Sequence, residues 1–284
     1  QEVAAMMDLA LVAARSGDSQ GLDALIENGF PPNTLDKYGG TVLHWAAGTG
    51  QLSSCKVLHA RGADPYIKLT KGGGRGRTVL HYAARNGHLQ VCQWLVDSLG
   101  MLPDIPTHDG TTPFQLAIWK GHLDVCDWLV HEKGVDVHQV NCYGCNGSHW
   151  AALGGNVDSA RWLQARGVSQ TTPNLVGHTA VHKAAQGGHT ALCEWLLGRV
   201  QGARQCLEMP DEDGNRPSQL AAAHGAADLS VFLTAQEGAA ALQLSEKEAA
   251  EVSDAKSETG GGKRATVTWP RRVFWLLIAV CLAA

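Results

Sequence analysis

The chain has 284 residues, of which 44% are hydrophobic and 18% are charged, and its formal net charge at pH 7 is -4. This composition is typical of a folded domain, and the slightly acidic balance gives no general attraction to nucleic acid, so nucleic acid is not an expected partner. The chain begins with Gln1 rather than Met, and the sequence leaves open whether a targeting peptide once preceded it.

One block of residues recurs along the chain at a spacing of 33 to 37 residues. It has the form Thr-x-x-His-x-Ala-Ala, followed three residues later by Gly. A degenerate copy opens the chain, with Leu11 in the position of the histidine. The later copies begin at Thr41, Thr78, Thr112, Asn146, Thr179 and Arg216. A fixed period of this length predicts a solenoid of stacked units.

Each residue type in the block has a physical role at the ends or on the surface of a short helix. Thr is a good N-cap, because its hydroxyl can satisfy one free N–H group at the helix start. Paired alanines such as Ala46 and Ala47 let a neighbouring helix approach closely. Gly then ends the helix, because it takes the left-handed cap conformation without a side-chain penalty. The glycines in this position are Gly50, Gly87, Gly121, Gly155, Gly188 and Gly225.

A second helix is predicted after each block, and its apolar residues fall on one face at helical spacing. Cysteine recurs at one position of this helix, with Leu three residues later. The cysteines at this position are Cys55, Cys92, Cys126 and Cys193. We expect them to be buried as small apolar side chains rather than joined in disulfides, which favours a reducing compartment.

The period, the Thr-Val-Leu-His block and the apolar second helix closely resemble those of the ankyrin-repeat family. The resemblance covers roughly residues 3–236. It implies an all-α repeat solenoid in which each repeat contributes a helix-turn-helix and a β-hairpin finger. We expect seven repeats over residues 1–236, with the first and the last degenerate. Proteins of this family usually bind other proteins on the concave surface formed by the fingers and the exposed edges of the first helices.

The resemblance assigns finger positions through the Asp/Asn-x-x-Gly turn before each first helix, of which residues 36–41 are the clearest example. We expect the residues inside this turn to point away from the core. Aromatic residues and Arg dominate interface energetics, so Tyr38, Trp119 and Tyr143 are the strongest candidates. The full set of candidate partner-binding residues is Lys37, Tyr38, Arg75, Arg77, Arg85, His108, Trp119, Lys120, Tyr143, Leu175, Val176 and His178.

An insertion rich in Gly and basic residues, from Tyr66 to Arg77, precedes the block that begins at Thr78. It is not a phosphate-binding P-loop, which needs Gly-x-x-x-x-Gly-Lys-Ser/Thr between a strand and a helix. Two interpretations stay open. The insertion is either a mobile loop or a basic finger that contacts an acidic partner or lipid headgroups.

Cys142 and Cys145 lie on a predicted finger tip, where packing does not explain them. Two thiols at this spacing can hold a metal or form a redox pair, but a structural zinc needs two further ligands. The candidates for these ligands are His108, His138, His178 and Cys206. The favoured interpretation is a pair of unused surface thiols, with no metal and no other cofactor.

The repeat accounts for most of the 13 histidines. Four of them, His44, His81, His149 and His182, belong to the recurring block, where we expect them to bond the turn backbone. The sequence contains no Gly-x-Ser-x-Gly, no His-Glu-x-x-His and no Gly-x-Gly-x-x-Gly after a strand. No nucleophile can be placed beside a base, so we do not expect an enzyme.

The repeat pattern ends after Leu233, and residues 237–268 have the composition of a flexible, charged and Gly-rich linker. Residues 269–284 are hydrophobic and carry no charge after Arg272. The twelve uncharged residues would rise about 18 Å as a helix, short of the roughly 30 Å bilayer core. However, Trp and paired Arg before an apolar run are typical of the edge of a membrane span. The candidate anchoring residues are Trp269, Arg271, Arg272, Phe274, Trp275, Leu276, Leu277 and Ile278.

Three explanations of this tail stay open. The sequence stops inside a longer transmembrane helix, or a short tail docks in lipid or in a groove of a membrane protein, or the tail packs back on the solenoid. If it spans a membrane, the Arg pair places the repeats on the cytosolic, stromal or matrix side.

The expected function is therefore that of a non-catalytic protein-interaction adaptor tethered to a membrane. The first alternative is a permanent accessory subunit of a large membrane complex. The second is a metal or redox protein that uses Cys142 and Cys145.

Overall fold

The computed structural model describes residues 2–239, in which two sets of helices alternate along the chain. The first helices are α1 (Glu2–Ser16), α3 (Val42–Gly48), α5 (Val79–Arg85), α7 (Pro113–Lys120), α9 (Gly147–Gly154), α11 (Ala180–Gln186) and α13 (Pro217–Ala223). The second helices are α2 (Ser19–Glu27), α4 (Leu52–Ala60), α6 (Leu89–Gln93), α8 (Leu123–Asp127), α10 (Val157–Ala165), α12 (Thr190–Arg199) and residues 227–239. Short 3-10 turns, η1 (Gly72–Gly74) and η4 (Gln205–Glu208), lie in connecting segments.

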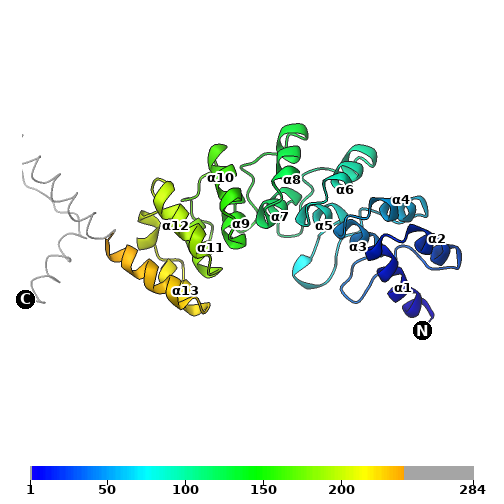
Figure 1. The fold of residues 1–284 in the computed structure, drawn as a ribbon, viewed down its shortest axis with the longest axis horizontal. Coiled ribbons are helices and arrows are strands. Elements are labelled where there is room, and N and C mark those ends of the chain that lie inside the picture. The colour runs from blue at the N-terminus through cyan, green and yellow to red at the C-terminus, as the bar shows by residue number, and fades with distance from the viewer. Residues whose placement is uncertain (1, 240–284) are drawn as a thin grey trace, which may run out of the picture. The chain divides into compact units, whose positions relative to one another are not determined.

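The helices stack as the sequence predicts. Each first helix packs on the next one, from α1 against α3 to α11 against α13, and each also packs on the second helix of its own unit. Figure 1 shows the first helices in one curved row, with second helices such as α6, α8 and α10 above it in the view. The predicted solenoid is confirmed, while the count of seven repeats and the boundary at residue 236 stay predictions. Of the predicted linker, residues 237–239 are helical, while residues 240–268 and the hydrophobic tail lie outside the described residues.

The fingers differ from the predicted β-hairpins, because residues 2–239 contain no strand. In most fingers a side chain bonds N–H groups of its own tight turn, whereas the finger before α5 is closed by backbone bonds between Leu69 and residues 76–77. The carboxylate of Asp36 accepts from the N–H groups of Tyr38 and Gly40 at 2.8 and 2.9 Å. Asn141 and Asn174 bond their own turns in the same way. The turns of the predicted hairpins are therefore present, closed by backbone bonds such as that from the N–H of Asp36 to the carbonyl of Gly40 at 2.8 Å, but their strands are not.

Successive fingers are nevertheless joined by single backbone hydrogen bonds. The N–H of Cys142 donates to the carbonyl of Asp109 at 2.9 Å, and the N–H of Leu175 donates to the carbonyl of Tyr143 at 3.0 Å. One bond between neighbours is too little for a β-ladder, which needs repeated pairs. It is enough to set the tips side by side.

In the units of α5, α9 and α11, the histidine of the recurring block connects the unit to the next, whereas Nε2 of His44 has no hydrogen-bond partner within residues 2–239. In α5, the N–H of Thr78 donates to Nδ1 of His81 at 3.2 Å, so the ring proton must sit on Nε2. That Nε2 donates across the unit boundary to the carbonyl of Thr111 at 3.2 Å. His149 and His182 repeat this pattern toward the carbonyls of His178 and Met209. The expectation that these histidines bond turn backbone is confirmed.

Gln115 makes the same bonds in one of the units that lack this histidine. Its Oε1 accepts from the N–H of Thr112, and its Nε2 donates to the carbonyls of Gln139 and Cys145. An amide reproduces the acceptor and the donor of a neutral imidazole at once. The position therefore requires one acceptor and one donor, and it has no place for a charged ring.

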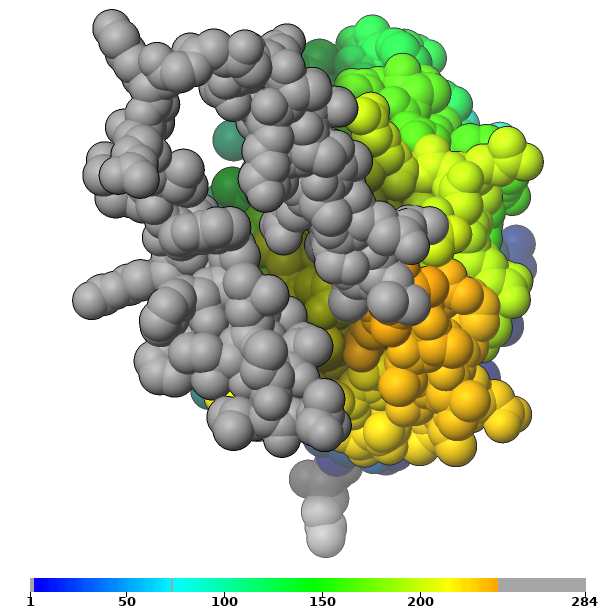
Figure 2. All heavy atoms as spheres, turned by 90° about the vertical axis from the view of Figure 1, so that its left-hand side faces the viewer, coloured from blue at the N-terminus to red at the C-terminus, as the bar shows by residue number. Residues whose placement is uncertain are grey.

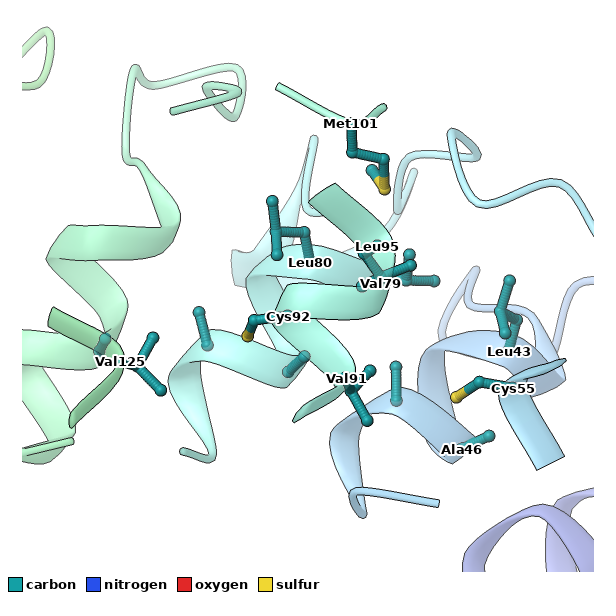
Figure 3. Close-up of a cluster of buried hydrophobic side chains, with 14 of the residues drawn as sticks. Leu43, Ala46, Cys55, Val79, Leu80, Val91, Cys92, Leu95, Met101 and Val125 are labelled. Atoms are coloured by element: carbon teal, nitrogen blue, oxygen red, sulfur yellow. The ribbon is translucent and has the colours of Figure 1, made fainter. Parts of the chain in front are cut away.

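The second helices bury the recurring cysteines, as predicted. Cys55, Cys92, Cys126 and Cys193 are all fully buried. Figure 3 shows Cys55 and Cys92 among apolar side chains such as Leu43, Leu80 and Val91. Burial raises the pKa of the Cys55 and Cys193 thiols to about 12, which keeps them protonated and inert. These four cysteines are therefore part of the hydrophobic core.

Two of the second helices contain one extra residue before the following loop. Leu95 and Met101 are six positions apart, whereas their counterparts Leu58 and Ala63 are five apart. The structure absorbs the addition as π-helical turns, η2 (Trp94–Ser98) and η3 (Trp128–Glu132). The N–H of Met101 still donates to the carbonyl of Leu95, as that of Ala63 does to Leu58. The insertion therefore leaves the exit of the helix unchanged.

The last described helix, residues 227–239, covers the C-terminal end of the array. Its Leu229 and Leu233 are buried in a cluster with Leu192, Leu196 and other residues of the preceding units. Figure 2 looks toward this end, where the helix appears in orange beside the yellow residues of the preceding unit. The array is thus closed by apolar packing at its last unit.

The buried imidazoles should make stability depend on pH. Burial lowers the pKa of His81 to about 3 and that of His44, His149 and His182 to about 4. Unfolded histidine titrates near 6.5, so between about pH 6.5 and pH 4 the unfolded chain binds more protons and stability falls as pH falls. For His81 alone, the loss between pH 7 and pH 5 is about 2 kcal/mol.

His81→Gln tests this, because Gln115 already fills the same position. We expect the variant to match the wild type at pH 7 and to lose less thermal stability between pH 7 and pH 5. The measurement is the midpoint of helical circular dichroism on heating at the two pH values. An equal loss in both proteins would contradict the assigned role of His81.

Gly154 should be needed for the contact between α7 and α9. A Cβ at this position would lie 2.1 Å from the carbonyl oxygen of Trp119. We expect Gly154→Ala to destabilise the chain by about 1–3 kcal/mol, as for other overpacked contacts. Gly198 in α12 is the matched control, because nothing lies within 4 Å of its Cβ direction. Gly198→Ala should be neutral or stabilise by about 0.5–1 kcal/mol in thermal melts, through helix propensity.

Candidate partner-binding surface

The first helices and the fingers together form one continuous surface, which we call the inner surface. It comprises the outward positions of α3, α5, α7, α9 and α11 and the finger tips before them. Figure 1 shows the finger before α5, in cyan, projecting from the row of first helices on the side away from the second helices. The inner surface therefore collects residues from every unit, spaced by the repeat.

A row of half-buried aromatic rings follows the first helices along the inner surface. Trp45 on α3 contacts Tyr82 on α5 with ring centroids 6.5 Å apart, and Trp119 on α7 contacts Trp150 on α9 at 5.9 Å. Sequence reasoning selected Trp119 but missed Trp45, Tyr82 and Trp150. The signal was available, because these three directly follow the histidine of the recurring block.

Basic side chains lie over these rings. The guanidinium of Arg15 is 4.1 Å from the ring centroid of Trp45, and that of Arg85 is 5.2 Å from the ring of Trp119. The ammonium of Lys120 is 4.3 Å from the same Trp119 ring. Each contact orients a cation by attraction to the ring face, without a carboxylate. The predicted residues Arg85, Trp119 and Lys120 are thus brought together.

The finger tips present exposed apolar side chains. Tyr38 and Tyr143 are each 56% exposed and Leu175 is 67% exposed. The backbone bond between Tyr143 and Leu175 holds the two tips next to each other, with Val176 following. The remaining tip residues predicted to face solvent, Lys37, Arg75 and His108, are also exposed, and Arg77 is half-buried.

His178 is a correction to the predicted set. Its side chain is buried rather than exposed, with Nε2 bonded to the carboxylate of Asp211 at 3.1 Å. Its ring also stacks on that of His182, with centroids 5.6 Å apart. The cause is a contact with the next finger, 33 residues later, which no local turn pattern reports. His178 therefore joins fingers and is not available to a partner.

The two finger thiols, Cys142 and Cys145, differ in environment. Cys142 is exposed, whereas Cys145 is half-buried and its Sγ accepts from Nδ2 of Asn174 at 3.2 Å. Within residues 2–239, no group of three or more His, Cys, Asp or Glu side chains is arranged to hold a metal ion. The predicted extra ligands His108, His138, His178 and Cys206 are therefore not gathered around the two thiols.

Stacked helix pairs with turn fingers and a linking histidine define an ankyrin-repeat protein. Family models for ankyrin repeats match residues 10–59, 50–141 and 142–243. The chain therefore belongs to the ankyrin-repeat family, whose arrays generally mediate protein–protein binding.

The curated relatives share only part of their length with this chain. A putative palmitoyltransferase, ZDHHC13 of Danio rerio, is 31% identical over 152 residues, which are 52% of this chain and 23% of that protein. Acyl-CoA-binding domain-containing protein 2 of Arabidopsis thaliana is 45% identical over 51 residues, 18% of this chain and 14% of that protein. The chain thus spans less than a quarter of the length of either relative.

The different settings of the cysteines should appear as different reactivity. We expect a maleimide reagent at pH 7.5 to modify the exposed Cys142 first, because Cys55 and Cys193 are buried and protonated. Peptide mass spectrometry of the folded chain should show Cys55, Cys92, Cys126 and Cys193 unmodified until denaturant is added. Early modification of these four would show that they do not belong to the core.

Proposed function

We propose that this chain is a non-catalytic adaptor that binds another protein through the inner surface and is tethered to a membrane by its C-terminal segment. The observation that carries the binding proposal is the set of exposed apolar finger tips beside an aromatic row. Large exposed apolar residues that gather on one face mark interaction sites rather than random surface. Tyr143 and Leu175 are the clearest examples.

The absence of catalysis is part of the proposal. Three of the four recurring histidines, His81, His149 and His182, use both ring nitrogens in hydrogen bonds to the backbone, and the fourth, His44, is buried. The putative palmitoyltransferase matches this chain over only 23% of its own length, so its activity is not transferred. Binding is what the shared repeats support.

The membrane tether rests on the composition of residues 269–284, which lie outside the described residues. Trp269, Arg271 and Arg272 precede an uncharged apolar run, which is the pattern of a membrane edge. Within residues 2–239, no helix is both long enough and apolar enough to cross a bilayer. We propose that the repeats lie in a reducing compartment, since their recurring cysteines are free and buried.

The binding proposal is tested by truncating two exposed apolar side chains on the finger tips. Tyr143→Ala with Leu175→Ala should reduce partner capture from a detergent extract about tenfold, the effect of losing one or two interface anchors. The melting profile should not change, because both side chains are exposed. Val231→Ser, which alters a 72% exposed side chain on the last helix, is the matched control and should capture normally. Unchanged capture by the double variant would refute the proposed surface.

Salt separates an adaptor from a permanent subunit. An adaptor should release its partner reversibly when salt is raised and bind it again on dilution, because exposed charges are screened. A subunit built into a large complex would stay with it through detergent and high salt. Co-purification under those conditions would favour the subunit.

A further inference from the structure

The charged residues of the array are paired differently on the second-helix side and on the inner surface. On the side of the second helices, cations pair with acids of the neighbouring unit. Arg61 bonds Asp23 at 2.7 Å and Glu27 at 2.6 Å, linking α4 to α2. Two further links of this kind join Arg166 to Asp127 and Lys133 to Asp97. On that side, Asp23, Glu27, Asp97 and Asp127 are thus paired with cations of the chain itself.

The cations of the inner surface have no such partners. Within residues 2–239, Arg77, Arg85 and Lys120 form no ion pair, and Arg85 Nε has no hydrogen-bond partner although it is shielded from solvent. Burial, together with the positive charge of Arg85, lowers the pKa of Arg77. Like charges held this close repel each other, and a bound anion would relieve the repulsion.

Asp109 attracts Arg77, but within residues 2–239 it forms no ion pair with any of these three cations. Asp109 lies on the adjoining finger, but its carboxylate accepts from the hydroxyl of Thr107 and the N–H of Thr111. Meanwhile, the Gly-rich finger before α5 adds three exposed cations to the same region, Lys68, Lys71 and Arg75. The part of the inner surface over α5 and α7 is therefore cationic, which we call the basic section.

The next part of the inner surface is apolar. The fingers before α9 and α11 carry Tyr143, Leu175 and Val176, all exposed, and no basic residue at their tips. We call these fingers the apolar section. The two sections are adjacent, since α7 packs on α9 and α9 on α11. The surface thus changes character along the array.

We infer that the partner presents an extended segment with acidic residues at one end and large apolar residues at the other. This rests on the proposed binding function. The carboxylates lie on Arg77, Arg85 and Lys120, and the apolar side chains pack on Tyr143 and Leu175. Packed helices are about 8–10 Å apart, so α5 and α9 are separated by about 20 Å, which is about six residues of extended chain. The segment therefore spans about ten to twelve residues in all.

The test is a selection of random 12-residue peptides displayed on phage, with the full chain as bait. We expect enriched peptides to carry several Asp or Glu and, about six residues away, Leu, Phe or similar residues. Binding of the selected peptides, measured by fluorescence polarisation, should weaken as salt increases. Enrichment of neutral or basic peptides would overturn the inference.

Variants connect the peptides to the basic section. Arg77→Gln with Arg85→Gln should weaken binding more than tenfold, while Gln keeps part of the side-chain length. Arg161→Gln is the control, because Arg161 pairs with Asp158 on α10, and it should change affinity less than twofold. Circular dichroism checks that all variants are folded. Equal affinities for the wild type and the double variant would also overturn the inference.

The outcomes separate this inference from the function it rests on. If peptides are enriched and need Tyr143 but are not acidic, the inference fails and the binding function stands. If no enriched peptide depends on Tyr143 or Arg85, both fail. Vesicles of phosphatidylcholine with phosphatidylserine, bound in an Arg85-dependent way in preference to peptide, would overturn the peptide in favour of lipid.

The chain also contains acidic residues of its own between 246 and 258. Zero-length carbodiimide crosslinking of the full chain distinguishes this occupant. Crosslinks from Lys120 to those residues in the same molecule would overturn the assignment to a separate partner, and their absence, with peptide binding intact, would support it.

Discussion

The contact on which this array depends is the neutral imidazole near the start of α5, α9 and α11. Its Nδ1 accepts from the N–H of the residue that caps its own helix, and its Nε2 donates to a carbonyl of the next unit. A helix pair cannot bury its apolar face alone, so each unit must be held in register with a neighbour. One small side chain achieves both the capping and the register, provided that it stays uncharged. The presence of Gln115 at the same position shows that the bonding pattern, not the imidazole, is what the fold requires.

Close packing of the first helices then determines how side chains are arranged on the inner surface. Small residues allow α7 and α9 to approach until a Cβ on Gly154 would meet the Trp119 carbonyl. At this separation, aromatic residues on successive helices touch, and their free faces line up along the array. The cations above them are attracted to the rings. The binding surface is therefore a consequence of the same tight spacing that stabilises the stack.

The sequence predicted those features that depend on residues close in the chain. Helix starts, the glycine ends, the buried cysteines and the exposure of Tyr38 and Tyr143 all follow from local pattern and period. It failed where contacts join units. His178 was predicted to be exposed because its turn resembles the others, but a hydrogen bond to Asp211 of the next finger keeps its side chain buried. The expected hairpins likewise contain no strand, and side chains such as those of Asp36 and Asn141 accept hydrogen bonds from N–H groups of their own turns. The period of a sequence shows which positions are equivalent in successive units. It does not show which side chain of the next unit a residue will contact.

The net charge of -4 does not indicate what this protein binds, because it adds together the charges of the second-helix side and of the inner surface. The charges on these two sides are paired differently. Between the second helices, acid and base face each other at the unit boundary, so charges there are satisfied within the chain. On the inner side, the buried His178 pairs with Asp211 between two fingers, but within residues 2–239 the cations over α5 and α7 have no such pairing between units. In the part of the chain that the structure describes, Arg77, Arg85 and Lys120 form no ion pair, although the chain as a whole is acidic. A surface that the fold leaves electrostatically unbalanced is one that a second molecule can balance, and its local sign, rather than the total, selects that molecule.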